Sequence, residues 1–232
     1  MSTFALRPRR CSACGAVSSA EVAVSLNGER RPDLREAILD GSFQRSTCAA
    51  CGAPHRVQDP FVYLDFARKE WITCFAPDRE PDWARLECEP MEDWREGMVT
   101  FAPPMVRELS AGFRIRAVFG VDALREKLLC FANGLDDAWV ELLKLQVMRE
   151  RADLLFSPSR RLRLYAVEPD TLWFGVMGTA HTLGVGREAL LALQDEPLAW
   201  LTPMEHLTRG PYVDLGRMML APESAPAEPL AP

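Results

Sequence analysis

The sequence predicts an α+β protein with a β-rich N-terminal unit and a mixed C-terminal region. Three observations support this fold class. Two Cys-x-x-Cys-Gly motifs, at residues 11–15 and 48–52, are separated by a stretch that has strand and helix patterns. Apolar residues alternate in short runs in both halves of the chain, which is typical of β-strands. Between residues 122 and 147 the apolar residues instead recur at helical spacing.

Length and composition indicate a soluble globular protein. The 232 residues can bury one large core or two modest ones. Hydrophobic residues make up 48% and charged residues 26% of the chain, as in ordinary soluble domains. No apolar stretch approaches the roughly 20 residues that span a bilayer, and no apolar run that would form a secretory signal precedes Cys11. We therefore expect a cytoplasmic protein with no membrane partner.

Charge is distributed unevenly along the chain, whose net charge is −6. Residues 1–60 carry eight Arg and six Asp or Glu, a net of +2, whereas residues 61–110 carry six basic and eleven acidic groups, a net of −5. No segment has the dense basic stripe that supplies most non-specific affinity for nucleic acids. The charge pattern therefore disfavours a nucleic-acid partner and favours another protein.

The two cysteine motifs have the spacing of a structural zinc site. Cys11 and Cys14 are followed, after 33 residues, by Cys48 and Cys51. Two cysteines separated by two residues can turn both sulfurs to one side of a tight turn, and the following glycine leaves room where backbone amides approach the thiolates. Two such turns facing each other make a tetrahedral four-sulfur shell. We therefore predict a structural Zn²⁺ in a zinc-ribbon-like unit, with these ligands: Cys11, Cys14, Cys48 and Cys51.

Three other uses of these cysteines stay open. A redox-active Cys-x-x-Cys motif usually stands alone near a βαβ unit, and two disulfides would need an oxidising compartment. An iron–sulfur centre uses the same thiolate ligands as zinc. His55, shortly after the second motif, could replace one cysteine, although a solvated loop histidine is the simpler interpretation. The remaining cysteines are expected to be small buried hydrophobic residues: Cys74, Cys88 and Cys130.

A shell of four thiolates leaves no position for water or substrate, whereas catalytic zinc sites keep one open. The motif therefore indicates an architectural role. Elsewhere in the sequence, no group of residues has the pattern of a catalytic site. His181 and His206 have no nearby nucleophile motif, and the paired Asp136 and Asp137 are explained more simply as helix caps. The sequence disfavours an enzymatic function without excluding it. We assign no catalytic or cofactor-binding residue.

The N-terminal unit contains signals for a strand, a helix and a hairpin. Residues 21–26 (EVAVSL) place three apolar side chains, Val24 among them, on one face of a strand. Residues 31–41 (RPDLREAILDG) predict a short helix that Gly41 ends. Residues 61–77 predict a hairpin. One face of its first strand carries Val62, Leu64 and Phe66.

In this order the motifs resemble the CpXC domain, a family named after paired Cys-Pro-x-Cys motifs. The resemblance rests on the two C-x-x-C-G motifs, the LREAILDG helix between them and the DPFVYLDF segment at 59–66. It covers residues 8–80, and the segment at 118–145 is similar to longer members. It implies that the four motif cysteines occupy the family's cysteine positions, and it implies no reaction. Ser12 and Ala49 stand where the name-giving prolines would be.

The C-terminal half combines strands with two helices. Residues 113–120 (FRIRAVFG) alternate as a strand, and residues 161–177 predict a second hairpin. Asp122 is the expected N-cap of one helix, and Asp136 or Asp137 that of the next. Because the join between the two helices is short, we expect them to fold back as an αα-hairpin.

Two further patterns have simple structural interpretations. Residues 184–189 (GVGREA) fit the glycine fingerprint of dinucleotide sites, but the flanking patterns indicate antiparallel hairpins rather than the required βαβ unit. Arg160, Arg161 and Arg163 form the most basic local cluster. It could bind an anion, although a solvated strand face is the simpler expectation.

Together these patterns predict four segments. A CpXC or zinc-ribbon-like domain spans 8–80, an acidic Pro-rich surface connector 81–104, an α+β region 105–220, and a disordered tail 221–232 that has too few large apolar groups to order. The expected function is a zinc-stabilised interaction or scaffold protein. A nucleic-acid-binding zinc ribbon is the alternative, supported by the motif type and the basic start RPRRC.

Overall fold

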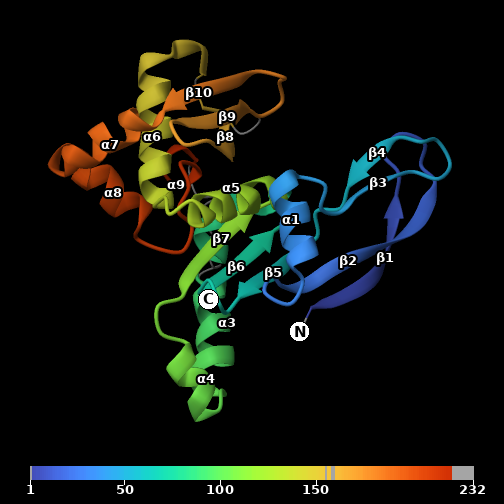
Figure 1. The fold of residues 1–232 in the computed structure, drawn as a ribbon. Helices are drawn as coiled ribbons and strands as arrows, with labels where there is room; N and C mark the ends of the chain where they lie inside the picture. Colours follow the sequence, from blue (N-terminus) through green and yellow to red (C-terminus); the bar gives the residue numbers. More distant parts are fainter. Residues whose placement is uncertain (1, 155, 158–159, 221–232) are drawn as a thin grey trace, which may run out of the picture.

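The computed structural model describes residues 2–154, 156–157 and 160–220, so the tail predicted at 221–232 lies outside the described residues. The protein is mixed α and β, as predicted. Its largest sheet has the strand order β1-β2-β5-β6-β7 (Figure 1). The strands are β1 (Thr3–Arg10), β2 (Val17–Asn27), β5 (Phe61–Asp65), β6 (Glu70–Phe75) and β7 (Arg114–Phe119). The β1–β2 and β5–β6 pairs are antiparallel, and the β2–β5 and β6–β7 pairs are parallel.

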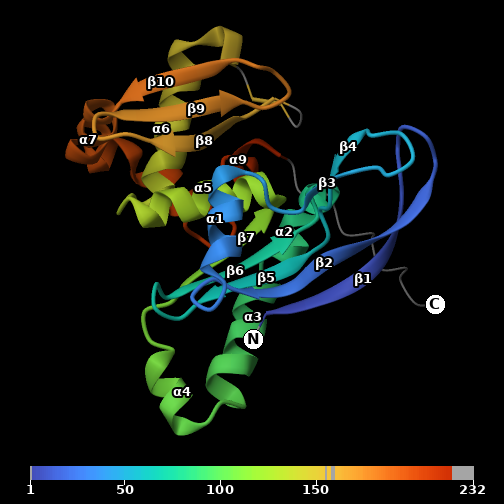
Figure 2. The same cartoon turned by 45° about the vertical axis from the view of Figure 1, so that its right-hand side comes forward.

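Helices cover both faces of this sheet. Figure 2 shows α1 (Pro32–Asp40) and α5 (Val121–Ala132) above it and α3 (Glu89–Arg95) below it. Helix α1 occupies the predicted span. A proline stands in its first turn, and Gly41 ends it in the left-handed conformation, with φ 82° and its amide bonded to the carbonyl of Ile38.

Strand β2 departs from strict alternation at one residue. Phe4 pairs with Ala23 and Thr3 pairs with Ser25, which leaves Val24 opposite no residue of β1. This β-bulge turns the Val24 side chain outward, where it is 45% exposed. In strand β5, the buried side chains belong to Phe61, Tyr63 and Asp65, on the face opposite the one predicted to be apolar.

The acidic segment, predicted as a connector at 81–104, is mostly helical. It contains a 3₁₀ helix at Pro77–Asp82, α2 (Trp83–Leu86), α3, a π-helix at Glu96–Thr100 and α4 (Pro104–Leu109). The buried ring of Trp83 lies 5.6 Å from that of Tyr212, and α3 contacts β6 and β7. Helices α2 and α3 therefore cover one face of the sheet.

A second, three-stranded sheet lies at the other end of the molecule, in the order β10-β9-β8 (Figure 1). Strands β8 (Leu162–Val167) and β9 (Thr171–Val176) form the predicted hairpin, and β10 (Thr182–Gly186) pairs antiparallel with β9. The sequence GVGREA crosses from β10 into α7 (Arg187–Asp195). Because this sheet is antiparallel, GVGREA lies outside the βαβ setting of a dinucleotide site, as predicted. The C-terminal half also contains 3₁₀ helices at Ala152–Leu154 and Pro197–Trp200, α8 (Leu201–Leu207) and α9 (Gly216–Met219).

Helices α5 and α6 (Asp137–Glu150) occur where the sequence places them, but their details differ. Asp136 caps α6 by accepting a 2.8 Å bond from the Ala138 amide, as predicted. Gly120, not Asp122, is the N-cap of α5, and Asp122 instead pairs with Arg56. Figures 1 and 2 show α6 crossing α5 steeply, so the predicted αα-hairpin is not confirmed.

One large apolar core joins the two sheets. Leu26 and Ile72 from the first sheet, Leu124 and Leu142 from α5 and α6, and Phe174 from the second sheet belong to it. Cys74 and Cys130 are buried in this core, as predicted, but Cys88 is exposed, so that part of the prediction was wrong. In the described part of the chain, no helix combines the length and apolar character needed to cross a membrane.

Candidate metal centre

The four motif cysteines lie at the tips of two hairpins. Residues 11–16 (CSACGA) join β1 to β2, and residues 48–53 (CAACGA) join β3 (Arg45–Thr47) to β4 (Pro54–Arg56). The two loops make the same backbone bonds: the first cysteine amide donates to the alanine carbonyl and the glycine amide to the first cysteine carbonyl. Their glycines have φ of 74° and 72°, which L side chains rarely adopt. The similar local sequences therefore give the two turns the same backbone conformation.

The two tips face each other, and their sulfurs form one group. Cys11 Sγ is 3.8 Å from Cys51 Sγ, and Cys14 Sγ is 3.7 Å from Cys48 Sγ. All four sulfurs lie within 4.8 Å of one another. A tetrahedral ion with metal–sulfur bonds of about 2.3 Å needs sulfurs about 3.8 Å apart, whereas a disulfide needs about 2.05 Å. The four residues could therefore hold one metal ion, and their geometry fits a tetrahedral site.

Little apolar packing surrounds this group. Cys14 and Cys51 are exposed, Cys11 is half-buried, and Cys48 is buried. All three residues of β3 are exposed. Because these residues bury little apolar surface, a metal ion that cross-links the sulfurs would add directly to the stability of the paired tips.

Backbone amides favour thiolate formation unequally within the group. The Ala50 and Cys51 amides lower the pKa of Cys48 to about 7. At Cys14, the Ala16 amide also lowers the pKa, but the hydrogen bond with the Cys51 thiol and partial desolvation outweigh it and raise the pKa to about 12. Cys48 therefore ionises more readily than Cys14, and a cation bound among the sulfurs would favour the thiolate form of its ligands.

His55 does not join the sulfur group. It lies on strand β4, where its Nε2 is 2.7 Å from the Ser46 hydroxyl, and the cluster of possible ligands contains the four cysteines alone. The histidine is half-buried on a strand rather than solvated in a loop, which corrects that part of the expectation.

Comparison with protein families agrees with this geometry. The family model described as CpXC protein matches residues 10–144. The chain belongs to the CpXC family. The match extends past the predicted 8–80 region through α5 and into α6, so it includes the five-stranded sheet from the end of β1 onward. No curated protein and no solved structure gave a significant match.

Other residues considered from the sequence form no second site. His181 and His206 are both exposed, the first between β9 and β10 and the second in α8 of this CpXC protein. Arg161 and Arg163 were expected on a solvated strand face, but both are buried. Arg161 pairs with Glu80, and Arg163 pairs with Glu126 and Asp214. The C-terminal segment around residue 214 and helix α5 cover this face of β8.

Sequence reasoning missed a buried charge network between α5, α6, β8 and the C-terminal segment. Asp137 accepts two 2.8 Å bonds from Arg116 and lies 3.1 Å from Lys127. Lys144 donates to Glu141 at 2.8 Å and to Glu126 at 3.0 Å. The network contains four carboxylates and four cations, all with little solvent exposure: Asp137, Glu126, Glu141, Asp214, Arg116, Lys127, Lys144 and Arg163.

Three of these carboxylates lie close enough to ligate a metal. Oxygens of Glu126, Glu141 and Asp214 lie within 4.8 Å of one another. Lys144 already bonds two of them, and Arg163 bonds two. Because the side-chain cations match the carboxylates in number, this cluster needs no added ion. It is a structural network.

The sequence contains one weak signal for this network. Only three of the 27 basic residues are lysine, and two of them, Lys127 and Lys144, lie next to leucines in the predicted helices. A lysine among apolar residues indicates a buried carboxylate partner. The partners themselves, Asp137, Glu141 and Glu126, were not predictable, because which carboxylates meet the lysines depends on how α5 and α6 cross.

Proposed function

We propose that the four cysteines bind one Zn²⁺ in a closed four-thiolate site and that the ion fastens two hairpins of a zinc-ribbon-like unit. The observation that carries this proposal is the pair of sulfur–sulfur distances, 3.7 and 3.8 Å, across the two loops. Two hairpins that each carry a Cys-x-x-Cys turn are the architecture of a zinc ribbon. With all four positions taken by sulfur, the ion has a structural role.

The proposed role of the fastened unit is protein–protein interaction. Strand β1 stands at the edge of the five-stranded sheet, and the exposed side chains of Leu6 and Val17 lie on the hairpin that carries the first metal loop. Exposed strand edges with apolar side chains are sites where other chains add. Zinc would hold this hairpin in a fixed position, so a protein partner would meet a rigid surface.

A nucleic-acid-binding ribbon is the second candidate. A cavity of about 210 Å³ beside Cys11 is lined by Arg9, Arg10 and Arg56. Arg9 and Arg56 are paired with Asp59 and Asp122, and a Zn²⁺ with four thiolates would carry a net charge of −2 next to this cavity. These negative charges offset the arginines, so the protein-interaction role is better supported.

Metal analysis tests the first part of the proposal. Untagged, reduced protein should contain about one zinc per chain and release four thiols on chelation. An iron–sulfur centre would instead give iron and visible absorption. A filter-binding series from low to high salt tests the second candidate, because phosphate contacts weaken steeply with salt. Binding to a nucleic acid at low salt would reverse the preference stated here.

A further inference from the structure

Three arginines lie around the cavity that borders the metal centre. This cavity of about 210 Å³ is lined by Arg9, Arg10 and Arg56 together with Cys11 and Cys48. A space this small is comparable in width with the Debye length, about 8 Å at physiological salt, so charges on its walls act on one another with little screening. The arginines and the sulfur ligands therefore share one electrostatic environment.

Two of these arginines already have carboxylate partners. Arg9 forms an ion pair with Asp59, and Arg56 forms one with Asp122. Arg10, by contrast, forms no ion pair with any residue that the structure describes. Its positive charge is therefore the one that the carboxylates around this cavity leave unbalanced.

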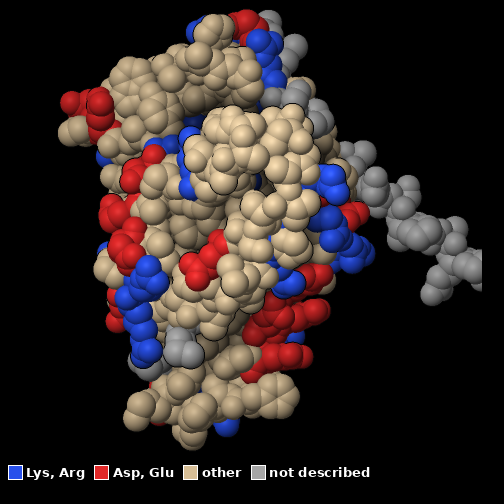
Figure 3. Space-filling view, turned by 90° about the vertical axis from the view of Figure 1, so that its right-hand side faces the viewer, with Lys and Arg blue, Asp and Glu red and all other residues tan. Residues whose placement is uncertain are grey.

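Arg10 is also the residue that stands immediately before the first metal ligand. Its Nη1 donates to the carbonyl oxygen of Gly15 at 3.5 Å, so the guanidinium lies against the first metal loop. Figure 3 looks onto the end of the molecule that carries the hairpin tips, and basic side chains there are scattered among acidic ones rather than gathered in one area. Because this face has no broad basic surface for an external polyanion, the thiolates are the better counter-charge for Arg10.

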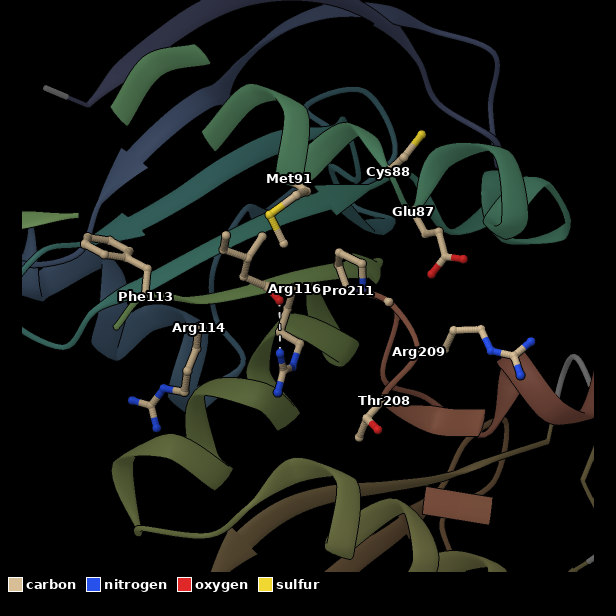
Figure 4. Close-up of a pocket in the computed structure, with 11 residues that line it drawn as sticks. Glu87, Cys88, Met91, Phe113, Arg114, Arg116, Thr208, Arg209 and Pro211 are labelled. Atoms are coloured by element: carbon tan, nitrogen blue, oxygen red, sulfur yellow. Dashed lines mark hydrogen bonds between the residues drawn. The ribbon is translucent and has the colours of Figure 1, made fainter. Parts of the chain in front are cut away.

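The arginines of the larger groove between α3 and β7 have different surroundings. Figure 4 shows the guanidinium groups of Arg114 and Arg209 pointing outward from this groove. Arg116, which also lines it, donates two bonds to Asp137. Neither cluster of potential metal ligands in the described part of the chain lies on this groove, whereas Arg10 lines a cavity with two of the four motif cysteines.

We propose that Arg10 is the counter-charge of the four-thiolate centre and strengthens its hold on the metal. This role rests on the proposed function, because four thiolates around one Zn²⁺ carry a net charge of −2. The two paired arginines of the cavity leave this charge in place, and the guanidinium of Arg10 offsets part of it. Residues outside the ligand shell tune metal affinity in this way.

Competition with a zinc chelator in the full-length, zinc-loaded protein tests this role. Arg10→Gln removes the charge but keeps a polar side chain beside Gly15. At about 0.05 M salt this variant should bind zinc roughly fivefold less tightly than the wild type, the upper range for one exposed ion pair. At about 1 M salt, where the Debye length falls to about 3 Å, the difference should disappear. Arg10→Lys keeps the charge and should bind zinc nearly as tightly as the wild type at low salt.

Arg7→Gln is the matched control, because Arg7 is an exposed arginine of the same strand and lies outside the cavity. It should bind zinc as the wild type does at both salt concentrations. Equal retention by the wild type and Arg10→Gln at low salt would overturn the proposal. So would a loss that persists unchanged in high salt, or an Arg10→Lys variant as weak as Arg10→Gln, because either would show that the charge is not what matters. A wild type that binds no zinc would instead contradict the proposed function, and this role with it.

Discussion

The ammonium group of Lys144 lies 3.0 Å from a carboxylate oxygen of Glu126, and both side chains are buried. This pair joins α5 to α6 inside a network whose charges balance. Buried charges are tolerated only when they are paired and hydrogen-bonded. The network therefore fixes how the helices cross, and it connects the C-terminal segment to the family-matched region.

Removal of one member should leave its partner unpaired in the core. Lys144→Met should lower the free energy of unfolding by about 3–5 kcal/mol, because two carboxylates lose their shared cation. Chemical denaturation at neutral pH measures the change. Lys69→Met is the control: this lysine is half-buried above the Phe113 ring and lies outside the network, so about 1 kcal/mol or less is expected. Equal losses in the two variants would contradict a special role for the network.

Acid should weaken the fold through Asp214. Burial alone would raise the pKa of this carboxyl, but Arg163, Lys144 and Lys127 outweigh it and hold the pKa well below the usual value. The folded state therefore binds this proton less readily than the unfolded chain does. Its stabilisation is present above the unfolded pKa of about 3.9 and is lost as pH falls through the lower, folded pKa.

Melting curves of the wild type and Asp214→Asn between pH 7 and pH 3 measure this effect. The variant should be the less stable protein at pH 7, and the difference should shrink toward pH 3. Both proteins carry the same cysteines, so any loss of metal in acid should affect both equally and leave the difference between their melting temperatures unchanged. A constant difference over the whole range would show that Asp214 is not the group that titrates.

Glu70 should give a pH dependence of stability opposite to that of Asp214. Burial raises its pKa to about 7 and Asp65 adds to the effect, although Arg35 and Arg114 oppose it. The folded state therefore keeps a proton that the unfolded chain releases near pH 4.3, so stability falls as pH rises from about 4 to 7. Glu70→Gln should unfold at a higher temperature than the wild type at pH 8, with little difference at pH 5. A loss of stability at both pH values would mean that an ionised Glu70 is needed by the nearby arginines.

The glycines of the two metal loops should be hard to replace. Gly15 has φ 74°, so Gly15→Ala should strain the first loop by about 1–3 kcal/mol and weaken metal retention against a chelator. Gly97→Ala is the matched control, because a Cβ there would meet only an ordinary contact with Trp71 at 3.9 Å and the residue has no positive φ. Competition with a chromogenic chelator compares the two variants. Equal retention would contradict the importance of the loop conformation.

Local signals predicted much of the fold. Proline and Gly41 bound α1, β8 and β9 form the predicted hairpin, and Asp136 caps α6. These features depend on residues close in sequence. The grouping of the four cysteines was also predicted, because two Cys-x-x-Cys-Gly motifs in one chain are typical of a single four-thiolate site.

Features that depend on distant residues were not predictable. Arg163 alternates with leucines as a solvated residue would, yet residues 51 positions away in sequence cover it. Asp137 resembles a helix cap, but β7 provides Arg116 as its partner. Val24 follows a strict pattern that a bulge interrupts. In each case, tertiary contacts override a correct local pattern.

The most direct measurement is zinc content and thermal stability of the same protein before and after chelation, with Cys14→Ser and Cys88→Ser alongside. The account predicts about one zinc per chain in the wild type and in Cys88→Ser, whose replaced thiol is exposed and outside the sulfur group. Cys14→Ser should lose zinc, and chelation should lower the melting temperature of the first two proteins to that of Cys14→Ser. Reduced, metal-free wild-type protein that melts as high as the protein as purified would contradict a fastening role for the four cysteines.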